Sequence, residues 1–485
     1  MMKLAGRHVL VLGLGESGLA CARWCARQGA RVRVADTRTV PPYLDELKRR
    51  VTSADFRPGE FDKDLLDGID LLVLSPGLSG GLMVVIHARA ADIPVVGEIE
   101  LFAHALRDMN ADRQQLPPVL AITGTNGKTT TTALTGHLLR STGRTVGVAG
   151  NISPAALTAL MDAQDAHALP DAWVLELSSF QLETTETLNP VAATVLNISD
   201  DHLDRYIDLD EYASVKAKVF QSAAGTPGIQ VLNRNDPRVC RMVLPDRQIV
   251  SFGLDAPAAA EDFGLRVQRG ETWLVQGANF LMPVSELPLA GLHNAANAMA
   301  ALALCGSLGV EAATLLPALR SFRGLPHRVE KVADRDGVTW YDDSKGTNVG
   351  ATVAALEGIG GQLAHAGNQN DHKIILIAGG DGKGQDFSPL RLAVASHARA
   401  VILIGRDGPL IGKAIANSGV PIEVAVDMDD AVRRAAALAQ AGDAVLLSPA
   451  CASFDMYRNY EHRAQVFVTA VKALAANSEN GAGQS

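Results

Sequence analysis

The residues with the most evident chemistry are residues 124–130, which read Gly-Thr-Asn-Gly-Lys-Thr-Thr. An apolar run before them predicts a buried strand, and the stretch after them is compatible with a helix. In a turn of this kind, backbone N–H groups and a helix N-terminus surround phosphate oxygens. Lys128 adds a positive charge, and the Thr129 hydroxyl can reach a phosphate-bound Mg²⁺. The segment predicts binding of a nucleoside triphosphate; the alternative is a glycine-rich turn with a surface lysine.

Carboxylates near this loop predict metal binding. Glu176 lies in the apolar run 173–177, where a buried carboxylate is costly unless it is paired or bound to a metal. A Mg²⁺ ion, bound directly or through water, is the preferred interpretation. Asp200, Asp201, His202 and Asp204 follow the strand predicted over 191–197 and form a candidate second metal site. The alternative for this cluster is a solvated acidic loop.

Two later segments offer polar groups on predicted helices. Lys216 lies four residues after Tyr212 in a helical stretch, where most lysines are surface charges. Asn294 and Asn297 are three residues apart on an apolar helix, so both project from one face. Buried amides need hydrogen-bond partners, which a nucleotide base or phosphate could supply.

A second phosphate-binding pattern stands near the N-terminus. Residues 7–36 predict a strand, a Gly13-x-Gly15-x-x-Gly18 turn, a helix and a second strand that ends at Asp36. This is a dinucleotide fingerprint. It leaves two possibilities open, NAD(P) or the diphosphate of another nucleotide, and Ser17 suits a diphosphate. Residues 75–77 follow another predicted strand at the carboxyl edge of the same sheet, where ligands gather.

The third part of the chain again alternates strands with helical stretches, which predicts a parallel sheet. Three of its strands end in polar loops, residues 342–348, 379–384 and 448–455, and Arg328 precedes them. Lysines, hydroxyls and an arginine form a set of groups suited to a carboxylate substrate and a γ-phosphate.

Length and composition define the class of protein. The 485 residues predict three α/β domains, residues 1–115, 116–323 and 324–475, with a disordered tail at 476–485. A net charge of −9 argues against a nucleic-acid partner. Five scattered cysteines indicate reduced thiols in a cytoplasm. No apolar run is long enough to span a membrane, and no cleavage signal is evident at the N-terminus.

These motifs together resemble the Mur ligase family, which forms amide bonds with ATP in building the peptidoglycan peptide. The resemblance is carried by residues 124–129, 176–183, 201–202, 293–297 and 326–328. Residues 343–348, 379–384 and 448–453 look like those of the member that adds D-glutamate to UDP-N-acetylmuramoyl-L-alanine through an acyl phosphate. The resemblance covers essentially the whole chain. It implies a Rossmann-like N-terminal domain that binds UDP, a central P-loop ATPase-type domain and a Rossmann-like C-terminal domain.

The resemblance also implies roles for single residues. The implied catalytic residues are Lys128, His202, a carbamylated Lys216 and Arg328. Two Mg²⁺ ions are implied, with Thr129, Glu176, His202 and Lys216 as ligands. The implied ATP contacts are Gly124, Thr125, Asn126, Gly127, Lys128, Thr129, Thr130, Asn294, Asn297, Arg328, Asp343 and Lys345. The implied contacts of the UDP substrate are Gly15, Glu16, Ser17, Asp36, Thr37, Arg38, Ser75, Pro76, Gly77 and Asn151. The implied D-glutamate contacts are Lys345, Thr347, Lys383, Ser453, Phe454 and Tyr460.

We therefore expect a monomeric cytoplasmic ligase that acts on small molecules, without nucleic acid or membrane as partner. An NAD-dependent oxidoreductase would leave the Lys128 loop unexplained. A non-catalytic nucleotide-binding regulator would show no turnover dependent on acceptor and amino acid. The nearest enzyme alternatives are ligases that add L-alanine or a diamino acid, and folylpolyglutamate synthase.

Overall fold

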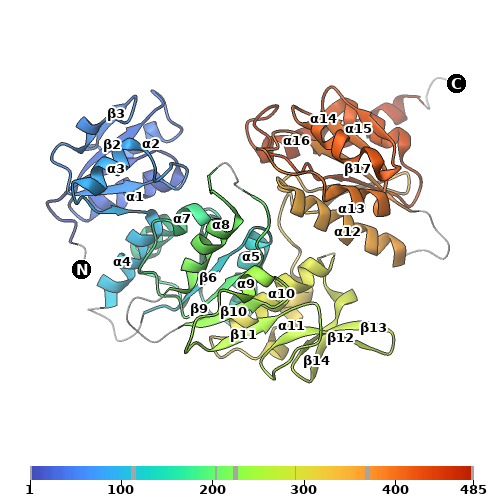
Figure 1. Cartoon of the computed structure of the whole chain (residues 1–485), viewed down its shortest axis with the longest axis horizontal. Coiled ribbons are helices and arrows are strands. Elements are labelled where there is room, and N and C mark those ends of the chain that lie inside the picture. Colours follow the sequence, from blue (N-terminus) through green and yellow to red (C-terminus); the bar gives the residue numbers. More distant parts are fainter. Residues whose placement is uncertain are drawn as a thin grey trace. The chain divides into compact units, whose positions relative to one another are not determined.

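The structure is a computed structural model that describes residues 3–110, 116–201, 205–221, 228–289, 291–365 and 372–481. The chain divides into two compact units. The first comprises Met1–Ile198, Asp210–Met282 and Ala298–Leu319, and the second comprises Ser199–Leu209, Pro283–Asn297 and Arg320–Ser485. Two sheets organise the first unit and one organises the second (Figure 1).

The first sheet is entirely parallel, in the order β3-β2-β1-β4-β5. Its inner strands are continuous apolar runs because both faces are covered, and Leu10, Leu12 and Leu72 have no exposed surface. β1 lies between β2 and β4, so the loop after β1 is at a point where the strand order reverses, a usual place for a ligand. The elements are β1 (His8–Leu12), α1 (Glu16–Arg27), β2 (Arg31–Asp36), α2 (Leu44–Arg50), β3 (Asp55–Pro58), η1 (Lys63–Leu66), β4 (Leu71–Leu74), α3 (Met83–Ala90), β5 (Val95–Val96) and α4 (Glu98–Asn110).

The second sheet has nine strands in the order β14-β13-β12-β11-β10-β9-β6-β8-β7. β6 is paired in parallel with both β8 and β9, so the loops after these three strands share one edge. Its strands are β6 (Val119–Thr123), β7 (Val146–Gly150), β8 (Ala172–Glu176), β9 (Ala192–Val195), β10 (Ile229–Asn233), β11 (Ile249–Phe252), β12 (Phe263–Gln268), β13 (Glu271–Gln276) and β14 (Asn279–Pro283). Its helices are α5 (Lys128–Arg140), α6 (Ala156–Asp165), α7 (Ser179–Leu182), α8 (Leu209–Ala217), η2 (Lys218–Phe220), α9 (Pro237–Cys240), η3 (Val284–Glu286), α10 (Leu292–Gly306) and α11 (Ala312–Ser321).

The third sheet has the order β15-β16-β20-β17-β18-β19. β20 is paired in parallel with β16 and β17, which brings the three predicted polar loops to adjacent positions. Apolar clusters cover both faces, one with α12, α13 and α14 and the other with α15 and α16. The elements are β15 (Glu330–Arg335), β16 (Val338–Asp342), α12 (Val349–His365), β17 (Ile374–Gly379), α13 (Leu390–His397), β18 (Ala398–Ile404), α14 (Gly408–Ile415), η4 (Ala416–Ser418), β19 (Ile422–Val424), α15 (Met428–Leu438), β20 (Ala444–Leu447) and α16 (Tyr460–Gly481).

The α/β class and the parallel sheets are confirmed. Two antiparallel pairings were not predicted: β12 with β13 in the second sheet, and β15 with β16 at the edge of the third, which the alternating pattern predicted to be parallel. The domain boundaries at 115 and 323 stay predictions. Helix α16 extends to Gly481, past the point where the tail is predicted to begin, and residues 482–485 lie outside the described part.

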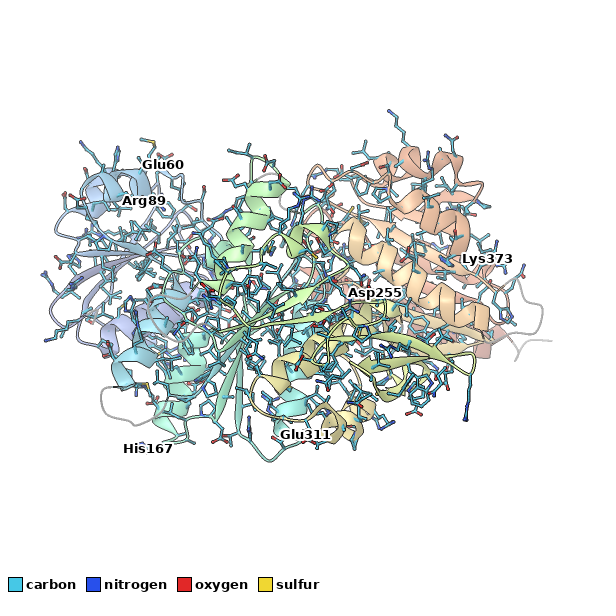
Figure 2. The ribbon with its side chains drawn as sticks, turned by 60° about the horizontal axis from the view of Figure 1, so that its bottom comes forward. Glu60, Arg89, His167, Asp255, Glu311 and Lys373 are labelled. Atoms are coloured by element: carbon cyan, nitrogen blue, oxygen red, sulfur yellow. The ribbon has the colours of Figure 1, made fainter. Side chains whose placement is uncertain are left out.

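The labelled Glu60, Arg89 and Glu311 are exposed charged side chains at the surface (Figure 2). Among the residues that the structure describes, none of the helices combines the length and apolar character needed to cross a bilayer.

Candidate active site

The predicted phosphate loop connects β6 to α5, with Lys128 as the first residue of the helix. Two glycines permit its path. Gly127 has φ +82°, and a Cβ on Gly124 (φ +147°) would come within 3.0 Å of the Leu196 Cβ. The loop therefore presents its backbone and the N-terminus of α5 together, the arrangement that binds phosphate.

Asn197, at the end of the neighbouring β9, fixes the loop. The amide N–H of Asn126 donates to Asn197 Oδ1 (2.8 Å), and Asn197 Nδ2 donates to the Asn126 carbonyl (3.1 Å). The Thr125 amide donates to the Asn197 carbonyl (2.9 Å). In the sequence, the only signal of Asn197 is its place at the end of a predicted strand, so its role at the loop was not predicted.

Two lysines converge on one oxygen of the loop. Lys128 Nζ donates to the carbonyls of Gly124 (2.8 Å) and Thr125 (2.7 Å). Lys216 Nζ donates to the same Gly124 carbonyl (3.0 Å) and lies 3.4 Å from Thr123 Oγ1. The Lys216 side chain is 1% exposed and its Nζ lies 4.6 Å from the centre of the Tyr212 ring. The interpretation of Lys216 as a surface charge is therefore wrong.

Glu176 lies beside this loop at the carboxyl end of β8 and is buried, as predicted. Asn151 Nδ2 donates to Glu176 Oε1 (2.8 Å), while Oε2 is buried and has no hydrogen-bond partner among the residues that the structure describes. A buried carboxylate oxygen without a partner is costly, and a hard cation is the ligand that it would accept best. These residues fit the first predicted Mg²⁺. His202, predicted for the second ion, lies outside the described residues.

The loops after β1, β2 and β4 enclose a cavity of about 360 Å³. It is lined by every predicted UDP contact of the first sheet: Gly15, Glu16, Ser17, Asp36, Thr37, Arg38, Ser75, Pro76 and Gly77. Asn151 is not among its lining residues; it lies beside Glu176 instead.

Asp36 is fully engaged within this cavity. Its Oδ2 accepts from the Leu14 amide (2.8 Å), and Arg38 donates to both oxygens at 2.7–2.8 Å. Burial by itself would raise the pKa of Asp36, but the hydrogen bonds from Arg38 and Leu14 lower it to about 2. Because both oxygens are occupied, this carboxylate is poorly placed to hold the ribose hydroxyls of NAD.

Two carboxylates join the first sheet to the start of α6. Glu16 Oε1 accepts from the Ser153 hydroxyl (2.7 Å) and the Ala155 amide (3.1 Å). Glu98 Oε1 accepts from the Leu157 amide (2.5 Å). Both acids lie at a helix N-terminus, which favours negative charge. Glu16 thus lines the first cavity and also holds the segment that carries Asn151.

The loops of the third sheet are held together by main-chain bonds and one buried arginine. Asp381 and Ala452 form an antiparallel bridge between the loops after β17 and β20. Arg463, 1% exposed on α16, donates to the carbonyls of Ser344 (2.8 Å) and Cys451 (3.1 Å). Burial lowers the pKa of Arg463 to about 10. The role of Arg463 was not predicted, because nothing in the sequence marks this arginine as buried.

The predicted D-glutamate contacts come from these loops. Lys345 Nζ lies 3.8 Å from the centre of the Tyr460 ring, so these two residues are adjacent. Ser453 is buried, whereas Lys383 and Phe454 are exposed, with Phe454 72% exposed. Thr347 lies two residues after Lys345, and its amide donates to the Lys345 carbonyl (2.9 Å).

The predicted ATP contacts of the second unit form two groups. Asn297 Nδ2 donates to Asn294 Oδ1 (3.1 Å), so the two amides share a face of α10 as predicted. Asp343 accepts from the Ser448 hydroxyl (2.6 Å). Burial raises the pKa of Asp343 to about 7, although the Ser448 hydrogen bond and the positive charge of Arg328 oppose the rise.

The sequence matches three family descriptions in chain order. Residues 7–97 match the Mur ligase MurD-like N-terminal domain, residues 122–305 the Mur ligase middle domain, and residues 327–451 the Mur ligase glutamate ligase domain. The chain belongs to the Mur ligase family. Its UDP-N-acetylmuramoylalanine–D-glutamate ligase relative from Aromatoleum aromaticum is 57% identical over 98% of this chain and 99% of that protein. A relative of the same name from Nitrosospira multiformis is 52% identical over 99% and 98% of the two chains.

Solved structures of Mur ligases and a related synthase share the fold. UDP-N-acetylmuramate–alanine ligase from Thermotoga maritima has a TM-score of 0.60 at 18% identity, over 96% of this chain and 99% of that one. Folylpolyglutamate synthase from Mycobacterium tuberculosis has a TM-score of 0.57 at 20% identity, over 76% and 95%. At such identities the likeness concerns the fold alone. The Mur ligase N-terminal match includes the glycine fingerprint, so the NAD interpretation is not supported.

Proposed function

We propose that this Mur ligase joins D-glutamate to UDP-N-acetylmuramoyl-L-alanine, with ATP, in the synthesis of peptidoglycan precursors. One observation carries the proposal: relatives with more than 50% identity over nearly the whole of both chains have this name. The match of residues 327–451 to a glutamate ligase domain supports the same amino acid.

The chemistry requires activation of a carboxylate. ATP phosphorylates the carboxylate of UDP-N-acetylmuramoyl-L-alanine to an acyl phosphate and leaves as ADP. The amine of D-glutamate then attacks the acyl carbon, forms the amide, loses a proton and expels phosphate. Because two anions meet in the first step, cations must offset their charge. Lys128 is suited to this by its place at the phosphate loop, and Arg328 is proposed to act on the γ-phosphate.

Two Mg²⁺ ions are proposed as cofactors. When bound, they would neutralise phosphate charge and polarise the phosphoryl oxygens. Thr129 and Glu176 would hold the first ion, and the Glu176 oxygen without a partner supports this assignment. His202 and a modified Lys216 would hold the second. Asn151 orients Glu176 through its hydrogen bond to Oε1.

Lys216 is proposed to be a carbamate. Its neutral amine would add to the carbon of CO₂ and release one proton, which gives an anionic oxygen pair that a hard cation accepts as a ligand. The geometry supports this because Lys128 and Lys216 both donate to the Gly124 carbonyl, and two ammonium groups around one oxygen repel each other. Lys218, the other candidate, donates instead to the Glu183 carbonyl (3.2 Å).

The decisive experiment measures phosphate release and product mass for the purified chain with ATP, UDP-N-acetylmuramoyl-L-alanine and single amino acids. We expect turnover with D-glutamate and little with L-glutamate, L-alanine or diaminopimelate. UDP-N-acetylmuramate, which lacks the L-alanine carboxylate, is the matched acceptor control. Turnover with L-alanine on that control would replace the proposal by L-alanine addition. ATP hydrolysis independent of acceptor and amino acid would contradict a ligase.

That the protein is a monomer and lies in the cytoplasm stays a prediction.

A further inference from the structure

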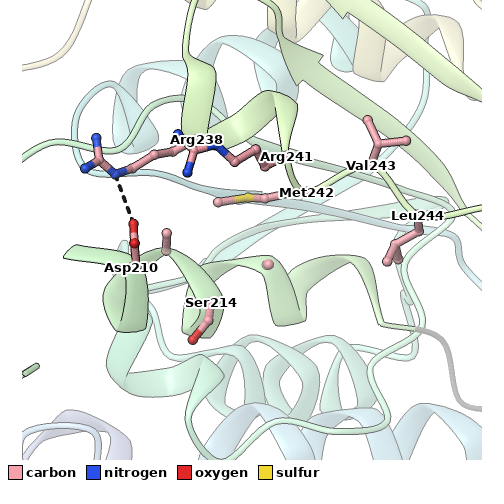
Figure 3. A pocket seen from close by; sticks show the side chains of 9 residues that line it. Asp210, Ser214, Arg238, Arg241, Met242, Val243 and Leu244 are labelled. Atoms are coloured by element: carbon pink, nitrogen blue, oxygen red, sulfur yellow. Dashed lines mark hydrogen bonds and ion pairs between the residues drawn. The ribbon is translucent and has the colours of Figure 1, made fainter. Parts of the chain in front are cut away.

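A second cavity, of about 370 Å³, lies between α8 and the segment that begins with α9 (Figure 3). None of its lining residues belongs to the sites described above. Its size falls in the range of pockets that hold small organic ligands. It lies wholly within the first unit.

The two walls of the cavity differ in chemistry. Helix α8 contributes short side chains, among them Ala213 and Ser214, which leave the space open. The facing segment contributes the apolar Met242 and Leu244 together with two arginines (Figure 3). An apolar surface and a cationic surface therefore line the same space.

The cationic groups are available to a ligand. Arg238 has one charged partner across the cavity, Asp210, at 3.4 Å, and both side chains are solvent-accessible (41% and 75%). Such an exposed pair contributes little stability, so an incoming anion can compete for the guanidinium. The Arg241 side chain has no hydrogen bond or ion pair with any residue that the structure describes. Two guanidinium groups against one carboxylate leave the lining with a net positive charge.

We propose that this cavity is a regulatory site for an amphipathic organic anion. The anionic head, a carboxylate or phosphate, binds Arg238 and Arg241, since guanidinium groups form paired hydrogen bonds with such oxygens. The apolar body lies against Met242 and Leu244. Burial of apolar surface supplies affinity, and the arginines supply selectivity for the anion.

Helix α8 connects this cavity to the active site. Ala213 and Ala217, four residues apart, line the cavity. Tyr212 and Lys216, also four apart, occupy another face of the same helix, because each residue advances about 100°. Lys216 contacts the Gly124 carbonyl (3.0 Å), and the Thr125 hydroxyl donates to the Tyr212 hydroxyl (3.4 Å). A ligand that moves α8 therefore moves the proposed carbamate lysine; this regulatory part rests on the proposed function, and the binding part does not.

Calorimetric titration of the full chain without substrates tests the binding. Octanoate is the probe, and its controls each lack one feature: acetate lacks the apolar body, 1-octanol the charge, and octylammonium has the opposite charge. We expect octanoate to bind at least fivefold more tightly than each control. Equal affinity for octanoate and 1-octanol would overturn the anion site, and absence of octanoate binding would overturn the cavity as a ligand site.

Variants locate the binding. Arg241→Gln and Arg238→Gln should each weaken octanoate binding at least threefold. Ser214→Phe should abolish it by filling the cavity from an exposed position. Arg391→Gln, an exposed arginine on α13 of the other unit, is the matched control and should bind as wild type does. Octanoate affinity that is unchanged in both cavity arginine variants and in Ser214→Phe would overturn the assignment.

Turnover at saturating substrates then tests regulation. Octanoate should change kcat at least twofold in wild type and Arg391→Gln, and leave kcat unchanged in Ser214→Phe. Binding that leaves kcat unchanged in wild type would overturn the regulatory part. Failure of the proposed ligase activity itself would be seen without octanoate, so the two outcomes are distinguishable.

Discussion

Two lysines at the predicted phosphate loop share a hydrogen-bond partner but differ in position. Lys128 and Lys216 both donate to the Gly124 carbonyl, but Lys128 begins α5, whereas Lys216 is a buried residue of α8. The first position suits a charge directed at phosphate oxygens. The position of Lys216 suits the proposed carbamate, because a cation could bind beside this lysine only after its positive charge had been replaced by a negative one.

Lys128→Ala should lower turnover by at least about a hundredfold, which is roughly what the loss of one transition-state donor costs. The fold should be retained, because the two carbonyls to which Lys128 Nζ donates, those of Gly124 and Thr125, belong to its own loop. Steady-state phosphate release and the thermal midpoint measure the two effects. Lys413→Ala, on the exposed surface of α14, is the control. Turnover at the wild-type level in folded Lys128→Ala would remove this lysine from the mechanism.

Lys216→Ala should be inactive and partly rescued by acetate, which can supply the missing carboxylate oxygens to a cation. Native mass spectrometry of wild type should show one added CO₂, and the added mass should be absent from Lys216→Ala. Lys218→Ala is the matched control, because Lys218 donates to the Glu183 carbonyl instead. This variant should keep both the CO₂ adduct and the activity. Loss of the adduct in Lys218→Ala alone would transfer the assignment to that residue.

Lys383→Ala should raise the KM for D-glutamate far more than that for ATP. The Lys383 ammonium lies in an exposed turn after β17. Without it, one of the two carboxylates of bound D-glutamate would lack a partner, at a cost of roughly 1–3 kcal/mol. Initial rates with each substrate varied in turn measure the split. An effect on ATP alone would assign the loop to nucleotide binding.

At the scale of elements, the start of α6 is held by two acids, Glu16 of α1 and Glu98 of α4. Glu98 is buried; Oε1 accepts from the Leu157 amide, and Oε2 has no hydrogen-bond partner within the described part of the chain. Burial raises the pKa of Glu98 to about 7, the negative charge of Glu16 adds to the rise, and the hydrogen bond opposes it. The folded state therefore holds a proton here at pH values where the unfolded chain has lost it.

Because this folded pKa is above the ordinary value of 4.5, Glu98 contributes stability at low pH that is lost as pH rises towards 7. Glu98→Gln keeps an acceptor for Leu157 but cannot ionise. We expect the variant to gain stability relative to wild type between pH 5 and 8, by roughly 2–3 kcal/mol. Urea unfolding at both pH values measures this difference. The Leu157 amide keeps an acceptor in both wild type and Glu98→Gln. If the difference in unfolding free energy between the two proteins were the same at pH 5 and pH 8, Glu98 would be charged in the folded state.

At the scale of the whole molecule, the third sheet has apolar clusters on both faces and needs no other sheet to complete them. Residues 324–481 are therefore expected to fold alone and to unfold in one cooperative urea transition followed by circular dichroism. The control, residues 324–459, lacks α16 and with it the buried Phe467 and Arg463. It should lose cooperativity. Absence of a transition in the longer fragment would show that this sheet depends on the rest of the chain.

The sequence alone determined the local features of the structure, which depend on residues that are neighbours in the chain. A glycine-rich turn between an apolar strand and a helix defines the phosphate loop, and strands that end in polar loops define the parallel sheets. Strand order then follows only from tertiary pairing. β20 between β16 and β17, and β6 between β8 and β9, brought together loops that lie far apart in the sequence.

Only the tertiary structure decided the state of individual polar groups, because burial and partners come from distant segments. Lys216 donates to the carbonyl of Gly124, 92 residues away in the sequence. This contact is part of a buried environment, although the sequence around Lys216 is that of an ordinary surface lysine. Arg463 joins the loops after β16 and β20 from a helix whose sequence gives no sign of it. Asp36 matched a ribose-binding pattern, yet its oxygens are occupied by Arg38 and Leu14. Residue spacing specifies a local turn, but a charge acquires its role from the groups that surround it after folding.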